Sequence, residues 1–315
     1  ILEFSFSFII AYLLNSALIG TTVSFLIFFI IAFYLLSIFS FLFLLQSSDL
    51  ILPLENYFKN KIISQAIQKL KDINIKRTES NKGPIKIIGI TGSYGKTTMK
   101  ETITAILGQQ FKVVSTRGNN NTPIGIARTI LNYVNEDTEI FVVEMGEYVK
   151  GDVAKLCHIA KPDISIITGI NEAHLDRYGT MQNAIDTKFE IVENAKKDAF
   201  VLLNVDDELI QDNYKRFCDN YKIEFYTSKS EKDNLAKYKV ENYEFRQDEN
   251  GISFEITKGN WSIGKLTVPF LADYIIGYIM AGIVIAKEFH MSDPLIRLGI
   301  STLKPVEHRL QPSIR

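Results

Sequence analysis

A glycine-bearing turn followed by a lysine and two threonines is the part of this sequence best suited to chemistry. The turn follows the isoleucine-rich, β-branched run Ile85–Ile90 and holds the residues that we expect to bind phosphate: Gly92, Ser93, Tyr94, Gly95, Lys96, Thr97 and Thr98. Glycines let backbone N–H groups converge on phosphate oxygens, and a helix that begins there directs its positive end at them. Lys96 is spaced to reach the outer phosphates of a nucleoside triphosphate, and the Thr97 hydroxyl is placed to ligate Mg²⁺.

The match to a phosphate loop is not strict. The strict pattern has a glycine five residues before Gly95, where this chain has Ile90. An ordinary strand–turn–helix junction is therefore the alternative, but the order of strand, glycines, lysine and threonines favours the phosphate loop.

Strands and helices alternate from Pro84 onward, which predicts an α/β fold: a mostly parallel sheet with helices on both faces. We expect strands at Ile85–Ile90, Lys112–Ser115, Ile140–Glu144, Ile164–Ile167 and Phe200–Leu203, and helices at Lys96–Leu107, Gly125–Leu131, Ala184–Asn194 and Tyr274–Phe289. A hairpin over Tyr238–Trp261 predicts a small flanking antiparallel sheet. Ligands of such folds bind beyond the carboxyl ends of the strands, so Thr91, Glu144, Thr168 and Asn204 are expected at one edge.

Glu144 is the acidic residue with the clearest structural setting. It ends the apolar strand Ile140–Val143, where a carboxylate must be paired or solvated. Because Mg²⁺ prefers carboxylate oxygens, we expect Glu144 to be a metal ligand; a strand-end surface charge is the alternative.

Several further stretches, in the same order along the chain, resemble the Mur ligase family, the ATP-dependent amide-forming enzymes of peptidoglycan synthesis. They are Thr91–Thr98, Gly118–Gly125, Val142–Gly146, Asn171–Asp176, Lys188–Ile191, Leu203–Asp207 and Glu307–Leu310. The resemblance covers the family's central ATPase domain. The asparagine-rich segment and Glu-Met-Gly most resemble the branch that adds D-alanyl-D-alanine to a UDP-muramoyl tripeptide.

The resemblance implies ATP and Mg²⁺ as cofactors and gives several residues a role. The histidine that matches His174 contacts magnesium in the family, and the lysine that matches Lys188 is carbamylated and helps to hold a second magnesium ion. Asn204 and Arg309 are expected to contact the nucleotide, and Lys96, Lys188 and His174 are the expected catalytic residues. By spacing alone Lys188 is a helix-surface lysine, and carbamylation would need burial to favour its neutral amine.

The same resemblance places the acceptor substrate at Asn120, Asn121 and Thr122, although a plain Asn-Asn-Thr-Pro turn is the alternative. Asn171 and Asp176 are expected to shape their loop, and Asp206 and Asp207 to mark a turn. Gly277 stands where the family has an asparagine that reads the adenine edge, so adenine recognition is left open.

The amino-terminal stretch predicts a membrane segment. No charged residue occurs from Phe4 to Ser48, and a bilayer-spanning helix needs about 20 apolar residues. We expect helices near Phe4–Ile19 and Val23–Leu45, with a turn between Asn15 and Ser24; a cleaved signal peptide and a buried soluble helix pair are the alternatives. The lysines that follow favour the inner (cytoplasmic) membrane with the catalytic part in the cytoplasm.

Composition and resemblance together predict the organisation of the chain. Lys and Arg number 35 against 36 Asp and Glu, which disfavours a nucleic-acid surface, and two cysteines give no disulfide framework or metal spacing. We expect a membrane segment over 1–48, an amphipathic connector over 49–83, the ATP-binding domain over 84–309 and, over 310–315, the start of a linker. The family's other two domains are not recognised here, so we expect a fragment.

Three functions remain as hypotheses. The leading one is an ATP-dependent ligase that joins D-alanyl-D-alanine to a UDP-muramoyl peptide through an acyl phosphate. A ligase for another amino acid, or for glutamate on a folate, keeps the fold and changes the substrate. A membrane-tethered nucleotide-binding scaffold without catalysis is the third.

Overall fold

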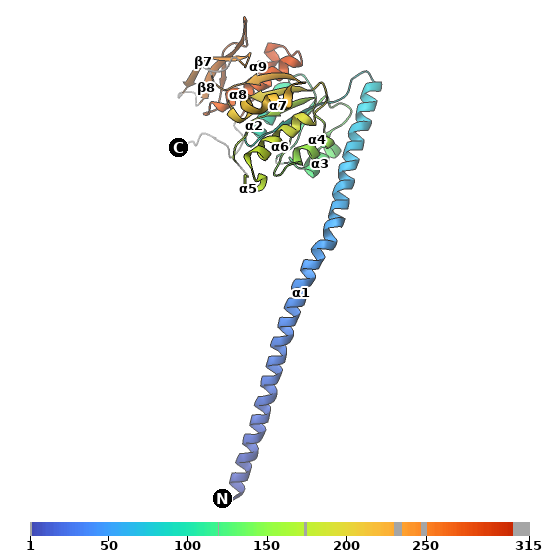
Figure 1. The fold of residues 1–315 in the computed structure, drawn as a ribbon, viewed down its shortest axis with the longest axis vertical. Coiled ribbons are helices and arrows are strands. Elements are labelled where there is room, and N and C mark those ends of the chain that lie inside the picture. Colours follow the sequence, from blue (N-terminus) through green and yellow to red (C-terminus); the bar gives the residue numbers. More distant parts are fainter. Residues whose placement is uncertain (1, 119, 173–174, 230–234, 247–250, 305–315) are drawn as a thin grey trace. The chain divides into compact units, whose positions relative to one another are not determined.

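The structure is a computed structural model, and it describes residues 2–118, 120–172, 175–229, 235–246 and 251–304 (Figure 1). The chain divides into two compact units, Ile1–Asn60 and Lys61–Arg315, which are considered in turn.

From Leu2 to Asn60 the first unit is part of one uninterrupted helix, α1 (Leu2–Glu79), so the prediction of two helices with a turn between Asn15 and Ser24 is wrong. That stretch contains no proline, and the Ser24 hydroxyl donates a hydrogen bond to the Gly20 carbonyl 2.8 Å away, within the helix. Small polar residues are therefore accommodated without a break. Gly20–Phe41 is long and apolar enough to cross a membrane by length and composition, a test that a signal sequence also passes.

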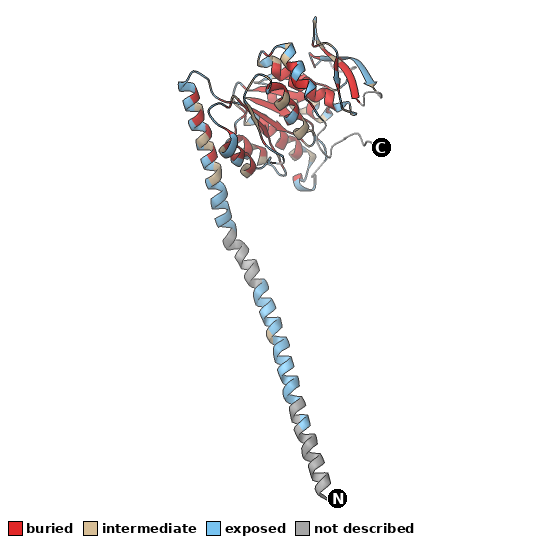
Figure 2. Ribbon diagram, turned by 180° about the vertical axis from the view of Figure 1, so that it is seen from behind, coloured by how far each residue is buried: buried red, intermediate tan, exposed pale blue. Residues whose placement is uncertain are grey.

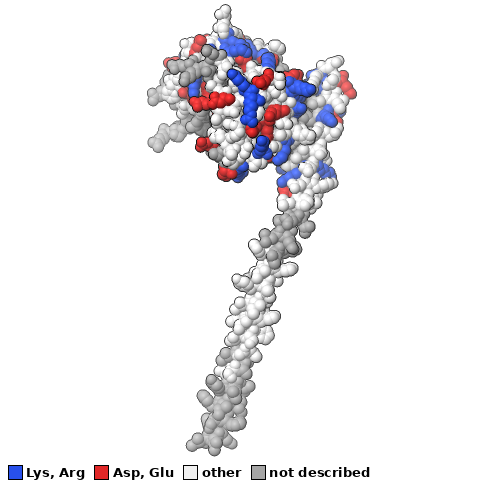
Figure 3. All heavy atoms as spheres, viewed as in Figure 1, with Lys and Arg blue, Asp and Glu red and all other residues white. Residues whose placement is uncertain are grey.

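The described surface of that span is exposed and carries no charged side chain (Figures 2 and 3). Its large apolar side chains include Phe25, Phe29 and Phe33, each more than 60% exposed. Charged side chains of both signs are scattered over the face of the second unit seen in Figure 3. The span Gly20–Phe41 and the second unit thus present chemically different surfaces to their surroundings.

The second unit begins with the last turns of α1. Ala66, Leu70 and Ile73 are buried in the same core cluster as Ile85 and Ile87 of the first strand region. The helix ends at Glu79, directly before the turn-forming residues Ser80–Pro84. Arg77 is buried and donates hydrogen bonds to the carbonyls of Gly83 and Glu136, which fixes the chain as it enters the sheet.

Six parallel strands form the main sheet in the order β2-β3-β1-β4-β5-β6. Their bounds are β1 (Lys86–Thr91), β2 (Val113–Ser115), β3 (Ile140–Glu144), β4 (Ile164–Ile167), β5 (Phe200–Asn204) and β6 (Lys222–Tyr226). Successive side chains of a strand point to opposite faces, and Ile87 and Ile88 accordingly enter different core clusters. Strands buried on both faces read as continuous apolar runs, which is why the sequence revealed most of them.

Helices cover both faces of this sheet, as predicted (Figure 1). One face packs against α2 (Lys96–Leu107), α8 (Tyr274–Glu288) and α9 (Asp293–Ser301). The other packs against α3 (Pro123–Tyr133), α4 (Asp152–Ile159), α6 (Met181–Glu193) and α7 (Glu208–Cys218). A short helix, α5 (Leu175–Tyr178), precedes α6. Cys157 and Cys218 are free and buried.

The predicted hairpin forms a small antiparallel sheet. Its strands are β7 (Lys239–Arg246), β8 (Gly251–Lys258), β9 (Trp261–Ser262) and β10 (Leu266–Val268), with β8 between β7 and β10 and also paired to β9. The sequence did not predict β6, β10, α4, α5, α7 or α9. All of these except α7, which is as long as the predicted α3, have nine residues or fewer, and the periodic signal over so few residues is weak.

Candidate active site

The residues from Gly92 to Thr98 connect β1 to α2 in the middle of the parallel sheet. Gly92 and Gly95 have φ angles of 140° and 76°, which side-chain-bearing residues rarely adopt. Ser93 N–H donates to the Gly169 carbonyl over 2.8 Å, which ties the loop to the end of β4. Gly95 caps α2 without a side-chain hydrogen bond, so the first-turn amides of this helix point outward with no acceptor inside it. This is the local geometry of an anion site.

Strand register places the other candidate groups around this loop. Ile90 pairs with Glu144 on one side, and Thr91 pairs with Ile167 on the other. The prediction that strand-end residues meet at one edge is therefore confirmed for the neighbours of β1.

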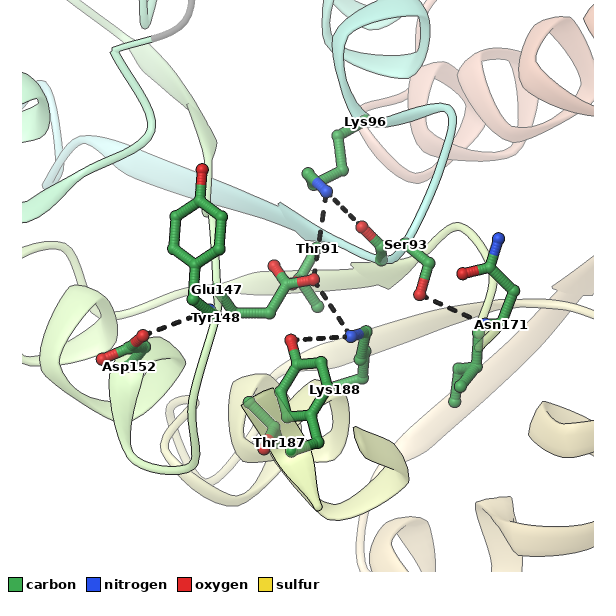
Figure 4. Close-up of polar contacts among 12 residues, drawn as sticks. Thr91, Ser93, Lys96, Glu147, Tyr148, Asp152, Asn171, Thr187 and Lys188 are labelled. Atoms are coloured by element: carbon green, nitrogen blue, oxygen red, sulfur yellow. Dashed lines mark hydrogen bonds and ion pairs between the residues drawn. The ribbon is translucent and has the colours of Figure 1, made fainter. Parts of the chain in front are cut away.

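Glu147 is the residue at the centre of the site, and no pattern in the sequence predicted this role. Its side chain is 3% exposed, and its Oε1 lies 3.2 Å from Lys188 Nζ and 3.9 Å from Lys96 Nζ. Its Oε2 accepts a hydrogen bond from the Thr91 hydroxyl over 3.0 Å. Figure 4 shows Lys96 of the phosphate loop and Lys188 of α6 approaching this carboxylate from opposite sides.

Lys188 is buried, with only 1% of its side chain exposed, so the helix-surface alternative is wrong. Its Nζ donates to the Tyr178 hydroxyl 3.1 Å away. Burial lowers the pKa of Lys188 from its ordinary value, whereas the Glu147 carboxylate opposes that shift and the Lys96 ammonium adds to it. A lysine in this setting gives up a proton more readily than one at the surface.

Glu144 forms a second buried pair with a lysine that was not predicted, Lys100 of α2. Lys100 Nζ lies 3.6 Å from Glu144 Oε2, and its side chain is fully buried. Glu144 Oε1 accepts a hydrogen bond from Asn121 Nδ2 over 3.2 Å, whereas the buried Oε2 has no hydrogen-bond partner. Lys100 follows Lys96 by one helical turn, a spacing that could have revealed it.

The residues present are suited to Mg²⁺ brought with a phosphate ligand. Magnesium is held in such sites by one or two carboxylates together with substrate phosphates and water. The Glu144 oxygen without a hydrogen bond offers one ligand, and Thr97 lies in the first turn of α2. Within the described part of the chain no three His, Cys, Asp or Glu side chains cluster, so a site made of protein ligands alone is not formed there.

A cavity of about 70 Å³ lies between these groups. Its lining residues come from the phosphate loop, the segments after β2 and β3, and α6: Ser93, Lys96, Asn121, Gly146, Glu147, Tyr148 and Lys188. Two lysines and one carboxylate therefore share a small polar space beside the loop.

The other predicted site residues have identifiable contacts. Thr122 caps α3 by accepting from Gly125 N–H, and Asn204 donates to the Thr168 carbonyl. Asp207 caps α7 and accepts from the Tyr94 hydroxyl over 3.0 Å, so it does more than mark a turn. His174 and Arg309 lie outside the described residues.

Comparison with known proteins identifies the family. The sequence matches the Mur ligase middle domain over residues 90–286, which is more than half of the chain. The chain belongs to the Mur ligase family. The Mur ligase match begins inside β1 and ends inside α8, and so includes both buried lysine–carboxylate pairs.

Its relatives include UDP-N-acetylmuramoyl-tripeptide–D-alanyl-D-alanine ligases. The Bacillus subtilis enzyme is 34% identical over 226 residues, which is 72% of this chain and 46% of the relative. The Synechocystis enzyme is 38% identical over 133 residues, 42% of this chain and 29% of the relative. This Mur ligase chain thus spans about half the length of the Bacillus relative.

Solved structures share the fold. MurF from Acinetobacter baumannii superposes with a TM-score of 0.69 at 20% identity, covering 80% of this chain and 51% of the other. MurF ligase from Thermotoga maritima, solved in complex with ADP, gives a TM-score of 0.65 at 24% identity, covering 79% of this chain and 53% of the other.

Proposed function

We propose that this chain is the ATP-binding core of a ligase that adds D-alanyl-D-alanine to a UDP-muramoyl peptide. The observation that carries the proposal is the convergence of Lys96, Lys188 and two buried carboxylates at the phosphate loop. The relatives named above support the substrates, because they are named for this reaction. In the first step ATP is the phosphoryl donor, and the carboxylate at the end of the muramoyl peptide is the phosphoryl acceptor.

The reaction would run in two steps. The peptide carboxylate attacks the γ-phosphorus of ATP, forming an acyl phosphate and releasing ADP. The amine of D-alanyl-D-alanine then attacks the acyl carbon, and inorganic phosphate leaves as the amide bond forms.

The residues of the loop serve the first step. Lys96 Nζ moves from Glu147 to the transferring phosphoryl group and stabilises its charge. The outward amides of α2 and the residues Gly92, Ser93, Tyr94, Gly95 and Thr98 hold the other phosphates. Thr97, Glu144, His174 and Lys188 would hold Mg²⁺, which neutralises phosphate oxygens when it is bound.

Lys188 would take part as a carbamate. Its buried position and lowered pKa favour the neutral amine that CO₂ requires. The modified side chain would carry a negative charge in place of a positive one. Asn204 and Arg309 would contact the nucleotide, and Asn120, Asn121 and Thr122 would contact the acceptor substrate.

We also propose that residues 1–48 anchor the enzyme in the inner membrane with the catalytic part in the cytoplasm. The support is the exposed, uncharged span Gly20–Phe41 and the lysines that follow it. Residues 49–83 would connect this anchor to the ATP-binding domain over 84–309, and 310–315 would begin a linker.

The test is ADP release by the full-length polypeptide, measured with UDP-muramoyl tripeptide and D-alanyl-D-alanine present together and singly. The proposal requires release that depends on both substrates and yields the amide product. ADP release that depends instead on another amino acid, or on glutamate together with a folate, would reassign the substrate. Nucleotide binding without turnover under any of these conditions would favour a scaffold.

A further inference from the structure

The Glu147 carboxylate is fixed in place independently of the two lysines that it contacts. Thr91 donates to Glu147 Oε2, and the same hydroxyl lies 3.3 Å from the Met145 carbonyl. Gly146 N–H donates to the Asn121 carbonyl over 2.9 Å, and a Cβ on Gly146 would lie 2.7 Å from Asn121 Cγ. The segment after β3 is therefore held closely, and the Glu147 side chain is directed into the cavity beside the phosphate loop.

The charge of Glu147 acts at short range and with little screening. Its side chain is 3% exposed, and among the described residues that line the cavity it is the only carboxylate. Salt weakens interactions between exposed charges much more than between buried ones. Glu147 lowers the summed charge of the ionisable groups at this cavity by one unit, whether Lys188 is the ammonium that pairs with it here or the proposed carbamate.

A phosphate group that enters the loop must draw Lys96 away from Glu147 and then lies near a fixed negative charge. Metal-free triphosphate carries its full negative charge and is repelled by the carboxylate. A triphosphate complexed with a divalent cation has a lower charge, and the cation is itself attracted to carboxylate oxygens. The position of Glu147 thus distinguishes two forms of the same ligand.

We propose that Glu147 is a specificity residue of the phosphate site, which disfavours metal-free nucleotide and admits nucleotide together with a divalent cation. The inference rests on the proposed function, because it takes the loop to be a nucleotide site. It goes beyond that function by assigning a residue that selects the form in which the nucleotide binds. A purely structural ion pair would affect stability and leave this selection unchanged.

The experiment measures binding of the non-hydrolysable β,γ-imido analogue of ATP by titration calorimetry. The full chain is kept in mild detergent, with either excess MgCl₂ or EDTA. The quantity compared is the ratio of the Kd in EDTA to the Kd in MgCl₂. Because it is a ratio within one protein, the fraction of folded material does not alter it.

In Glu147→Gln the ratio should fall at least about tenfold, because metal-free binding tightens while metal-dependent binding weakens. Glu147→Ala also removes the charge and should give the same fall, whereas Glu147→Asp keeps the charge and should stay near the wild-type ratio. Glu101→Gln is the matched control: its side chain is 51% exposed and pairs with Lys100 at 3.2 Å, so the same neutralisation occurs at the surface.

An unchanged ratio in both Glu147→Gln and Glu147→Ala would overturn the inference while leaving the nucleotide site intact. An equal fall in Glu101→Gln would also overturn it, because net charge alone would then explain the effect. A wild-type chain that binds the analogue under neither condition would instead refute the proposed function itself.

Discussion

Replacing Gly95 with alanine tests how the phosphate loop is built. Gly95 has φ +76°, and a Cβ at this position would lie 2.0 Å from the Tyr278 hydroxyl oxygen and 2.6 Å from Tyr278 Cζ. Real Cβ atoms do not approach other atoms so closely, so Tyr278 or the loop must move. Tyr278 is 5% exposed within α8 and has little room to turn away.

The expected loss of stability has two parts. A left-handed backbone costs a non-glycine residue about 1–2 kcal/mol. Forcing an extra carbon into a packed site costs typically about 1–3 kcal/mol, so the total for Gly95→Ala is about 2–5 kcal/mol. Nucleotide binding should fall as well, because the amides that face the phosphates move with the loop.

Gly83→Ala separates the two parts. Gly83 has φ +70°, and a Cβ there would meet no atom within 4 Å, so this variant measures the backbone cost alone. Urea unfolding in mild detergent, followed by the fluorescence of Trp261, the one tryptophan of the chain, reports on the second unit. When Tyr278 is replaced by leucine, Gly95→Ala should lower the free energy of unfolding by about as much as Gly83→Ala does.

Two results would refute this reasoning. If Gly95→Ala lowers the free energy of unfolding by no more than Gly83→Ala does, Tyr278 does not confine the loop. If Gly95→Ala lowers the free energy of unfolding equally in the wild-type and Tyr278→Leu backgrounds, the strain does not come from Tyr278.

The remaining predictions concern the lysines and the amino-terminal segment. Lys96→Ala should abolish ATP-dependent turnover with an unchanged circular dichroism spectrum, because Lys96 contacts Glu147 and the Gly92 carbonyl rather than the core. Lys188→Ala should lose activity, and formate or acetate should partly restore it by occupying the vacated space. Burial lowers the pKa of Lys188 below its ordinary 10.5, so its neutral amine becomes available at lower pH than that of an exposed lysine. The carbamate ¹³C signal from labelled bicarbonate should therefore grow as the pH rises from neutral to alkaline. Deleting residues 1–48 should make the remainder soluble without detergent.

Each of these has an outcome that would count against it. Wild-type turnover in Lys96→Ala would remove the phosphate-loop assignment. A fully active Lys188→Ala variant would end any role for that lysine, and an inactive one that no carboxylate restores would argue against carbamylation; exposed Lys197→Ala serves as the control. The absence of a carbamate ¹³C signal at every pH would also argue against carbamylation of Lys188. Recovery of the full chain in the soluble fraction would contradict a membrane anchor.

The sequence by itself determined the parallel sheet and the place of the phosphate loop. Ile87–Ile90 and Ile140–Val143 carry no charged residue because their strands are buried on both faces, and such runs can be recognised locally. Once the strands are known, parallel pairing brings Thr91 and Glu144 to one edge. The prediction of a turn between Asn15 and Ser24 was wrong because small polar residues are weak helix breakers when proline is absent.

Only the tertiary structure decided which charges meet. Glu147 lies three residues beyond a recognised carboxylate, and nothing in its neighbours distinguishes it from a surface charge. It becomes the centre of the site because Lys188, 41 positions later on α6, is buried against it, while Lys96 approaches from the loop. Burial and ion pairing depend on how distant segments pack, and local periodicity carries no information about that choice of partner.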